Sequence, residues 1–65
     1  MIQYEAAVDL SESRRKELFN LLVVAQDYAM SVAEARQMAS DLFGLAEAQV
    51  LRIENEGLER TWPPL

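Results

Sequence analysis

The hydrophobic positions of this 65-residue chain follow helical spacing over three stretches and strand spacing over one. In residues 1–10, Ile2, Tyr4, Ala6 and Val8 alternate with other side chains, which is typical of a half-buried strand. No second stretch alternates in this way. A strand here would therefore pair with a second copy, join a partner's sheet, or lie as an extended arm on the helices; the alternative is a frayed terminus.

The first predicted helix runs from Ser11 to Ala29. Asp9 and Glu12 have the D-x-x-E spacing that caps a helix start, and no Gly or Pro interrupts the chain between them and Ala29. Helical spacing places six residues on its apolar face, with three more beside it: Leu18, Leu21, Leu22, Ala25, Tyr28 and Ala29, then Phe19, Val23 and Val24. This surface is broader than one neighbouring helix needs, which favours packing on two sides, inside a bundle or in a homodimer.

Two shorter helices are predicted over Val32–Phe43 and Glu47–Glu56. The sequence S-V-A-E from Ser31 is a capping box, and Gly44 and Gly57 stand where a left-handed residue ends a helix. In the first of these two helices a core-facing stripe follows at helical spacing: Val32, Ala35, Ala39 and Leu42, with Met38 and Phe43 beside them. The second carries Val50 and Ile53 and, on an adjacent line, Leu51 and Leu58.

The sequence thus predicts an all-α fold, a three-helix bundle in a single domain. Residues 1–10 form the arm, residues 11–57 the helices and residues 58–65 a tail. Because 65 residues bury only a small core, we expect marginal stability and support from a partner or a second copy.

Composition excludes several kinds of chemistry. The chain has no Cys and no His, so it lacks disulfides, the usual zinc and haem ligands, and the Ser-His and Cys-His nucleophiles. Helix-surface carboxylates in so small an acidic domain are usually solvated, so we expect no enzyme activity, no cofactor and no metal. No apolar run is long enough to span a bilayer and no secretion signal is present, which predicts a cytoplasmic location and no membrane partner.

The net charge of −5, from six basic and eleven acidic residues, disfavours binding to nucleic acid. Only Arg14, Arg15 and Lys16 are clustered. They lie in the first turns of a helix, where the macrodipole disfavours cations. The cluster either contacts an acidic partner or a phosphate, or forms a solvated face with Glu12 and Glu17 as ion partners.

The segment from Gly44 to Glu54, GLAEAQVLRIE, resembles the turn and second helix of repressor-type helix-turn-helix proteins, whose pattern is G-V-S-x-x-T-V-S-R-I-E. Gly44, Val50, Arg52, Ile53 and Glu54 match it, and the resemblance covers residues 35–57. The family's small residue, normally four positions before the turn glycine, is here Ala39, five positions before it, which implies an extra residue or a shifted turn.

The same resemblance implies which residues would face the major groove: Ala46, Glu47, Ala48, Leu51, Arg52 and Asn55. Only Arg52 and Asn55 have the chemistry for base or phosphate contacts. Glu47 would meet phosphate with like charge, and Leu51 replaces a small polar residue. This face therefore fits a groove on a protein better than it fits DNA.

A weaker resemblance concerns the N-terminal half. An alternating strand, a capped helix and then SVAEA from Ser31 is similar to the ribbon-helix-helix repressors, in which strands of a dimer enter the major groove. The strand residues that would read DNA are not basic, and the helix from Ser11 to Ala29 is longer than that family's first helix.

The tail carries the only Trp and both Pro residues, and the two prolines predict an extended end. Trp62 either folds back onto the bundle, or acts with Leu65 as an anchor in a partner's pocket.

These observations predict a non-enzymatic protein-interaction or regulatory module, dimeric, on a helix-turn-helix-like scaffold. Its predicted partner contacts are Leu51, Arg52, Asn55, Phe19, Val23, Trp62 and Leu65. The first alternative is a DNA-binding regulator that uses Arg14, Arg15, Lys16, Arg52 and Asn55. The second is an acidic inhibitor that mimics nucleic acid.

Overall fold

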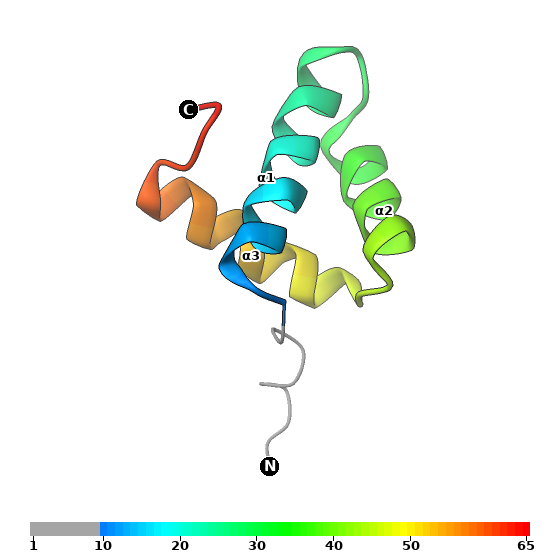
Figure 1. The fold of residues 1–65 in the computed structure, drawn as a ribbon. Helices are drawn as coiled ribbons and strands as arrows, with labels where there is room; N and C mark the ends of the chain where they lie inside the picture. The colour runs from blue at the N-terminus through cyan, green and yellow to red at the C-terminus, as the bar shows by residue number, and fades with distance from the viewer. Residues whose placement is uncertain (1–9) are drawn as a thin grey trace.

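The computed structural model describes residues 10–65 and consists there of three helices: α1 (Glu12–Asp27), α2 (Val32–Phe43) and α3 (Glu47–Arg60). Helices α1 and α2 form an antiparallel pair, and α3 crosses the end of that pair opposite the α1–α2 connection (Figure 1). The predicted all-α three-helix bundle is confirmed. The predicted N-terminal strand, including Asp9, lies outside the described residues.

The starts of α1 and α2 follow their capping residues. The hydroxyl of Ser11 accepts a hydrogen bond from the Arg14 amide (3.2 Å), so the N-cap of α1 is Ser11 and not Asp9 as the D-x-x-E spacing predicted. The capping box at Ser31 is confirmed: its hydroxyl accepts from the Glu34 amide (3.1 Å), and the Glu34 carboxylate accepts from the Ser31 amide (2.9 Å). Because these bonds satisfy otherwise unpaired amides, both helices begin within one residue of the predicted position.

Helix α3 is longer than predicted, because Gly57 lies inside it and does not end it. The helix continues to Arg60, and Thr61 takes the left-handed conformation (φ 54°). The Trp62 amide donates to the Gly57 carbonyl (3.0 Å), which turns the chain back toward the bundle. Gly57 is buried because the Phe19 ring lies over it, in space that a β-carbon would fill.

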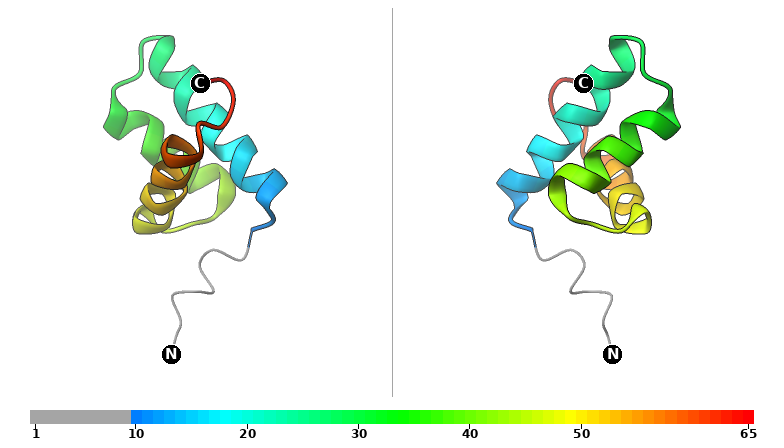
Figure 2. Two further views of the ribbon diagram at one scale, coloured as in Figure 1. Left: turned by 90° about the vertical axis from the view of Figure 1, so that its left-hand side faces the viewer. Right: turned by 90° about the vertical axis from the view of Figure 1, so that its right-hand side faces the viewer.

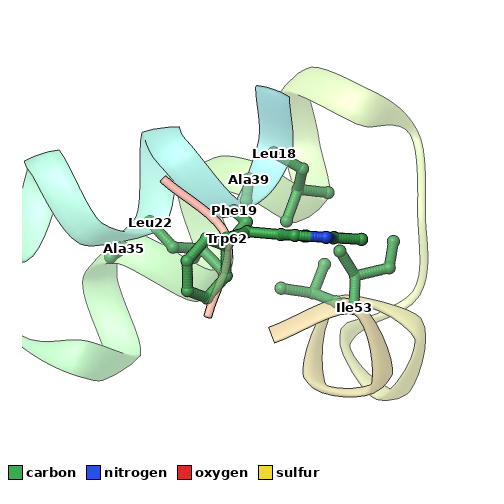
Figure 3. Close-up of a cluster of buried hydrophobic side chains, with 8 residues drawn as sticks. Leu18, Phe19, Leu22, Ala35, Ala39, Ile53 and Trp62 are labelled. Atoms are coloured by element: carbon green, nitrogen blue, oxygen red, sulfur yellow. The ribbon is translucent and has the colours of Figure 1, made fainter. Parts of the chain in front are cut away.

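The core combines large side chains from α1, α3 and the tail with small ones from α2. Its buried members are shown together in Figure 3: Leu18, Phe19, Leu22, Ala35, Ala39, Val50, Ile53 and Trp62. Because α2 contributes only alanines to this set, its backbone can approach α1 closely. Trp62 is 5% exposed and meets Phe19 edge to face, with ring centroids 6.2 Å apart.

Four residues predicted on core faces are exposed instead. Tyr28 is the C-cap of α1 and Ala29 has a positive φ of 104°, so the helical register ends before either can face the core. Val32 is the first residue of α2, at the end far from α3. Leu42 is 66% exposed in the last turn of α2, although Ala35 and Ala39 precede it at helical spacing and are buried.

The tail closes on itself and is not extended as predicted. The Leu65 amide donates to the Trp62 carbonyl (3.0 Å), which makes a turn over the two prolines. Figure 2 shows this segment returning from the end of α3 toward α1. Trp62 thereby closes the core from the side that α2 leaves open.

Candidate functional site

The connection between α2 and α3 is a tight turn centred on Gly44. Gly44 adopts the left-handed conformation (φ 66°, ψ 38°), and its amide donates to the Ser40 carbonyl. The same carbonyl accepts from the Leu45 amide (3.1 Å), while the Ser40 hydroxyl donates to the Leu45 carbonyl. These bonds fix the direction in which the chain leaves α2.

Ser40 connects α2 to this turn. It stands four positions before Gly44, at the place where the helix-turn-helix pattern has a small residue, and α2 runs without interruption to Phe43. Ala39, the residue compared with the small residue of the helix-turn-helix pattern, is buried, whereas Ser40 is half-buried and bonded to the turn.

The start of α3 lacks a side-chain N-cap. Ala46 occupies the cap position, where the family pattern has serine, and its amide donates to the Gln49 side chain (2.7 Å). Glu47 lies in the first turn, where the helix dipole favours a negative charge.

The six positions assigned to the outer face of α3 are all exposed: Ala46, Glu47, Ala48, Leu51, Arg52 and Asn55. Leu51 is 36% exposed. The opposite side of the same helix carries Val50, Ile53 and Gly57 into the core. We call these six residues the α3 outer face.

Two half-buried ion pairs hold α3 against its neighbours. Arg36 of α2 donates to Glu54 (2.9 Å). Arg15 of α1 donates to both carboxylate oxygens of Glu56 (2.8 and 3.2 Å) and also to the Leu10 carbonyl (2.7 Å). A bidentate pair of this kind restricts the orientation of the two helices. The sequence carried no signal for these pairings, because the partners lie far apart along the chain.

The three cations of the basic cluster in α1 pair with three different carboxylates. Arg15 binds Glu56 of α3, whereas Arg14 binds Glu17 and lies 4.7 Å from the centroid of the Phe43 ring. Lys16 pairs with Glu12 (3.4 Å) and lies 5.8 Å from the Trp62 ring centroid. Each cation of the cluster therefore has an acidic partner within the chain, and the partners of Arg14 and Lys16 are the two that the solvated-face interpretation names, Glu17 and Glu12.

Two of the predicted partner contacts are occupied by the chain's own core. Phe19 is fully buried and Trp62 nearly so, because each fills the space beside the other. Neither side chain can reach a partner from this conformation. Val23 is half-buried against the core, and Leu65 is exposed at the end of the tail.

No pocket opens into the bundle formed by residues 10–65, and these residues place no three metal-binding side chains together. Among the same residues, no helix is long and apolar enough to cross a membrane. No protein-family model, no curated protein and no solved structure matches this chain.

Proposed function

We propose that this chain is a non-enzymatic protein-interaction or regulatory module that presents the α3 outer face to a partner protein. The observation that carries the proposal is the composition of that face. Exposed Leu51 stands one position before Arg52 and four before Asn55, and Arg52 is the only cation among the six positions. An apolar side chain with polar neighbours is typical of an anchor in a protein interface.

The attachment of α3 to the bundle supports this proposal. Val50 and Ile53 are buried on its inner side, and Glu54 and Glu56 are tied to α2 and α1 by ion pairs. A helix held in this way loses little conformational entropy when its outer face binds a partner.

The distribution of charge favours a protein over DNA as the partner. Glu47 stands at the start of α3, where a phosphate would approach in a helix-turn-helix complex, and Glu59 makes no ion pair within residues 10–65. Arg14, Arg15 and Lys16 already have carboxylate partners, so binding to phosphate would have to compete with those contacts.

DNA binding is the second candidate, and the α2–α3 turn favours it. Gly44 in the left-handed conformation, followed by a helix with Val50 and Ile53 buried, has the spacing expected of a repressor-type motif. In that case Arg52 and Asn55 would contact the duplex, with help from the α1 cluster.

A salt titration with a labelled DNA duplex of mixed sequence separates the two candidates. The protein-interaction proposal predicts no measurable binding at low salt. Micromolar affinity that falls steeply between about 50 and 200 mM salt would contradict it and support the DNA-binding candidate. The Arg52→Ala variant, titrated in parallel, would then lose affinity if α3 contacts the DNA, whereas Arg60→Ala provides a control that removes the same charge outside the α3 outer face.

Self-association belongs to the same proposal. Much of the broad apolar surface of α1 that predicted a dimer, including Leu18, Phe19 and Leu22, is covered here by α2, α3 and Trp62 of one chain, whereas Val24 and Tyr28 are exposed. A second copy would instead use exposed apolar side chains such as Leu42 and Leu51. Sedimentation velocity at high protein concentration tests the dimer, and a single monomeric species would contradict it.

A further inference from the structure

Four exposed apolar side chains lie toward the α1–α2 end of the bundle, away from α3. They belong to Val24, Tyr28, Met30 and Val32, which are 37%, 80%, 38% and 44% exposed. Val24 and Tyr28 are one helical turn apart, and Met30 and Val32 follow in the connection and at the start of α2. Figure 1 places this connection at the top of the bundle, with α3 crossing the opposite end. We call these four residues the α1–α2 patch.

The backbone around the patch is held by hydrogen bonds. The Tyr28 amide donates to the carbonyls of Val24 (3.1 Å) and Ala25 (3.2 Å), and the Met30 amide donates to the same Ala25 carbonyl (3.2 Å). The capping box at Ser31 then begins α2 directly. The four apolar side chains are therefore presented from a defined backbone.

The charged residues that lie between Lys16 and Arg36 in the sequence are all acidic. The chain has no Lys or Arg between Lys16 and Arg36, whereas Asp27 and Glu34 lie within this stretch. Asp27 makes no ion pair within residues 10–65. The Glu34 carboxylate accepts the Ser31 amide but has no cationic partner there. The patch thus combines apolar side chains with carboxylates that no cation of the described chain neutralises.

We propose that the α1–α2 patch binds a cationic amphipathic segment of another protein. Lys or Arg side chains of that segment would pair with Asp27 and Glu34 and lie against the exposed Tyr28 ring, which attracts cations through its π face. Its apolar residues would cover Val24, Met30 and Val32, and the unbranched Met side chain adapts to different partner shapes.

Charge also argues against a second copy of this chain as the occupant. Two copies joined through this patch would bring Asp27 and Glu34 of both chains together, with no Lys or Arg between positions 16 and 36 to offset them. Like charges in an interface oppose association. The patch shares no residue with the α3 outer face, so an experiment that rules out binding at one of the two sites leaves the proposal for the other unaffected.

Calorimetric titration of the full chain tests this proposal, with a synthetic helical peptide of leucine and lysine as the probe. Peptides in which Gln or Glu replaces every Lys are the charge controls. We expect the lysine peptide to bind at least about tenfold more tightly than the glutamine peptide, and no binding of the glutamate peptide. The affinity should fall as salt rises, because the ion pairs are exposed.

Two pairs of matched variants locate the binding site. Tyr28→Ala with Met30→Ala should weaken binding roughly tenfold, whereas Leu42→Ala, an exposed apolar residue elsewhere, should leave it unchanged. Asp27→Asn with Glu34→Gln should also weaken it, and glutamine at position 34 keeps the capping box. Asp41→Asn with Glu59→Gln removes the same net charge away from the patch and should have little effect.

Three results would overturn the proposal. The first is the absence of lysine-peptide binding to the wild-type chain. The second is an equal loss of affinity in the two charge-removing pairs, which would mean non-specific attraction to an acidic protein. The third is a dimer in sedimentation that Tyr28→Ala with Met30→Ala dissociates, which would assign the patch to a second copy. Circular dichroism of each variant verifies that it is folded.

Discussion

The Phe19 ring of α1 lies against the backbone of Gly57 in α3, in the space that any larger residue at position 57 would need for its β-carbon. This close approach brings α1 and α3 together beside Trp62, whose ring meets Phe19 edge to face. Gly57 therefore has a packing role in the middle of a helix, although glycine is a poor helix former.

The Gly57→Ala substitution should destabilise the fold by about 1 to 2 kcal/mol. Overpacking against the fixed Phe19 ring costs about 1 to 3 kcal/mol, and the better helix propensity of alanine returns up to about 1 kcal/mol. Urea denaturation measures the difference. The cost should shrink when Phe19→Leu is present as well, and a Gly57→Ala variant as stable as the wild type would contradict the contact.

Trp62→Ala should remove much of the stability of the domain. Truncating a buried tryptophan costs about 3 to 5 kcal/mol, and a chain of this size has only about 5 kcal/mol or somewhat more in total. Thermal unfolding followed by far-ultraviolet circular dichroism tests this. Leu65→Ala is the matched control, because Leu65 is exposed in the same tail and should change the free energy of unfolding by less than about 0.5 kcal/mol. Equal stabilities of the two variants would mean that the tail does not close the core.

Arg15 should contribute more to stability than Arg60, although both pair with Glu56. Arg15 makes two bonds to the half-buried carboxylate and a third to the Leu10 carbonyl, whereas Arg60 is exposed and 3.6 Å from it. We expect Arg15→Ala to cost about 1 to 2 kcal/mol and Arg60→Ala less than about 0.5 kcal/mol in urea denaturation. Similar losses for both variants would show that the bidentate geometry adds nothing to the free energy of unfolding.

The two left-handed positions that flank α2 should respond in opposite directions to substitution. Gly44→Ala places a β-carbon on a residue with φ 66° and should cost about 1 kcal/mol, since no neighbouring atom crowds that position. Ala29→Gly relieves a φ of 104° and should leave stability unchanged or raise it by up to about 1 kcal/mol. A stabilising Gly44→Ala in urea denaturation would contradict the geometry of the turn.

The sequence predicted the helices well where local chemistry decides them. The capping box at Ser31 and the turn glycine at position 44 both act through neighbouring backbone groups, so the bounds of α2 matched the prediction. The end of α3 was wrong because a glycine inside a helix and a glycine after a helix look alike in sequence. Only the approach of Phe19, which is distant along the chain, distinguishes them.

The candidate surfaces were predictable only in part. Period 3.6 identified Val50 and Ile53 on the inner side of α3, whereas Leu51 was assigned to the outer face through the helix-turn-helix resemblance. The same period assigned Tyr28 to the core of an α1 that was taken to be two residues too long. Whether a side chain just beyond a helix end is covered depends on where the chain goes next, which no local pattern specifies.

The central claim is that Leu51 on the α3 outer face contacts a partner protein, and site-specific photo-crosslinking in the natural host tests it most directly. A photoreactive phenylalanine replaces Leu51 in one variant and Asn20, an exposed residue of α1, in the control. We predict a protease-sensitive adduct of discrete mass from position 51 and none from position 20. An adduct from position 51 that nuclease removes, or equal labelling from both positions, would contradict the claim.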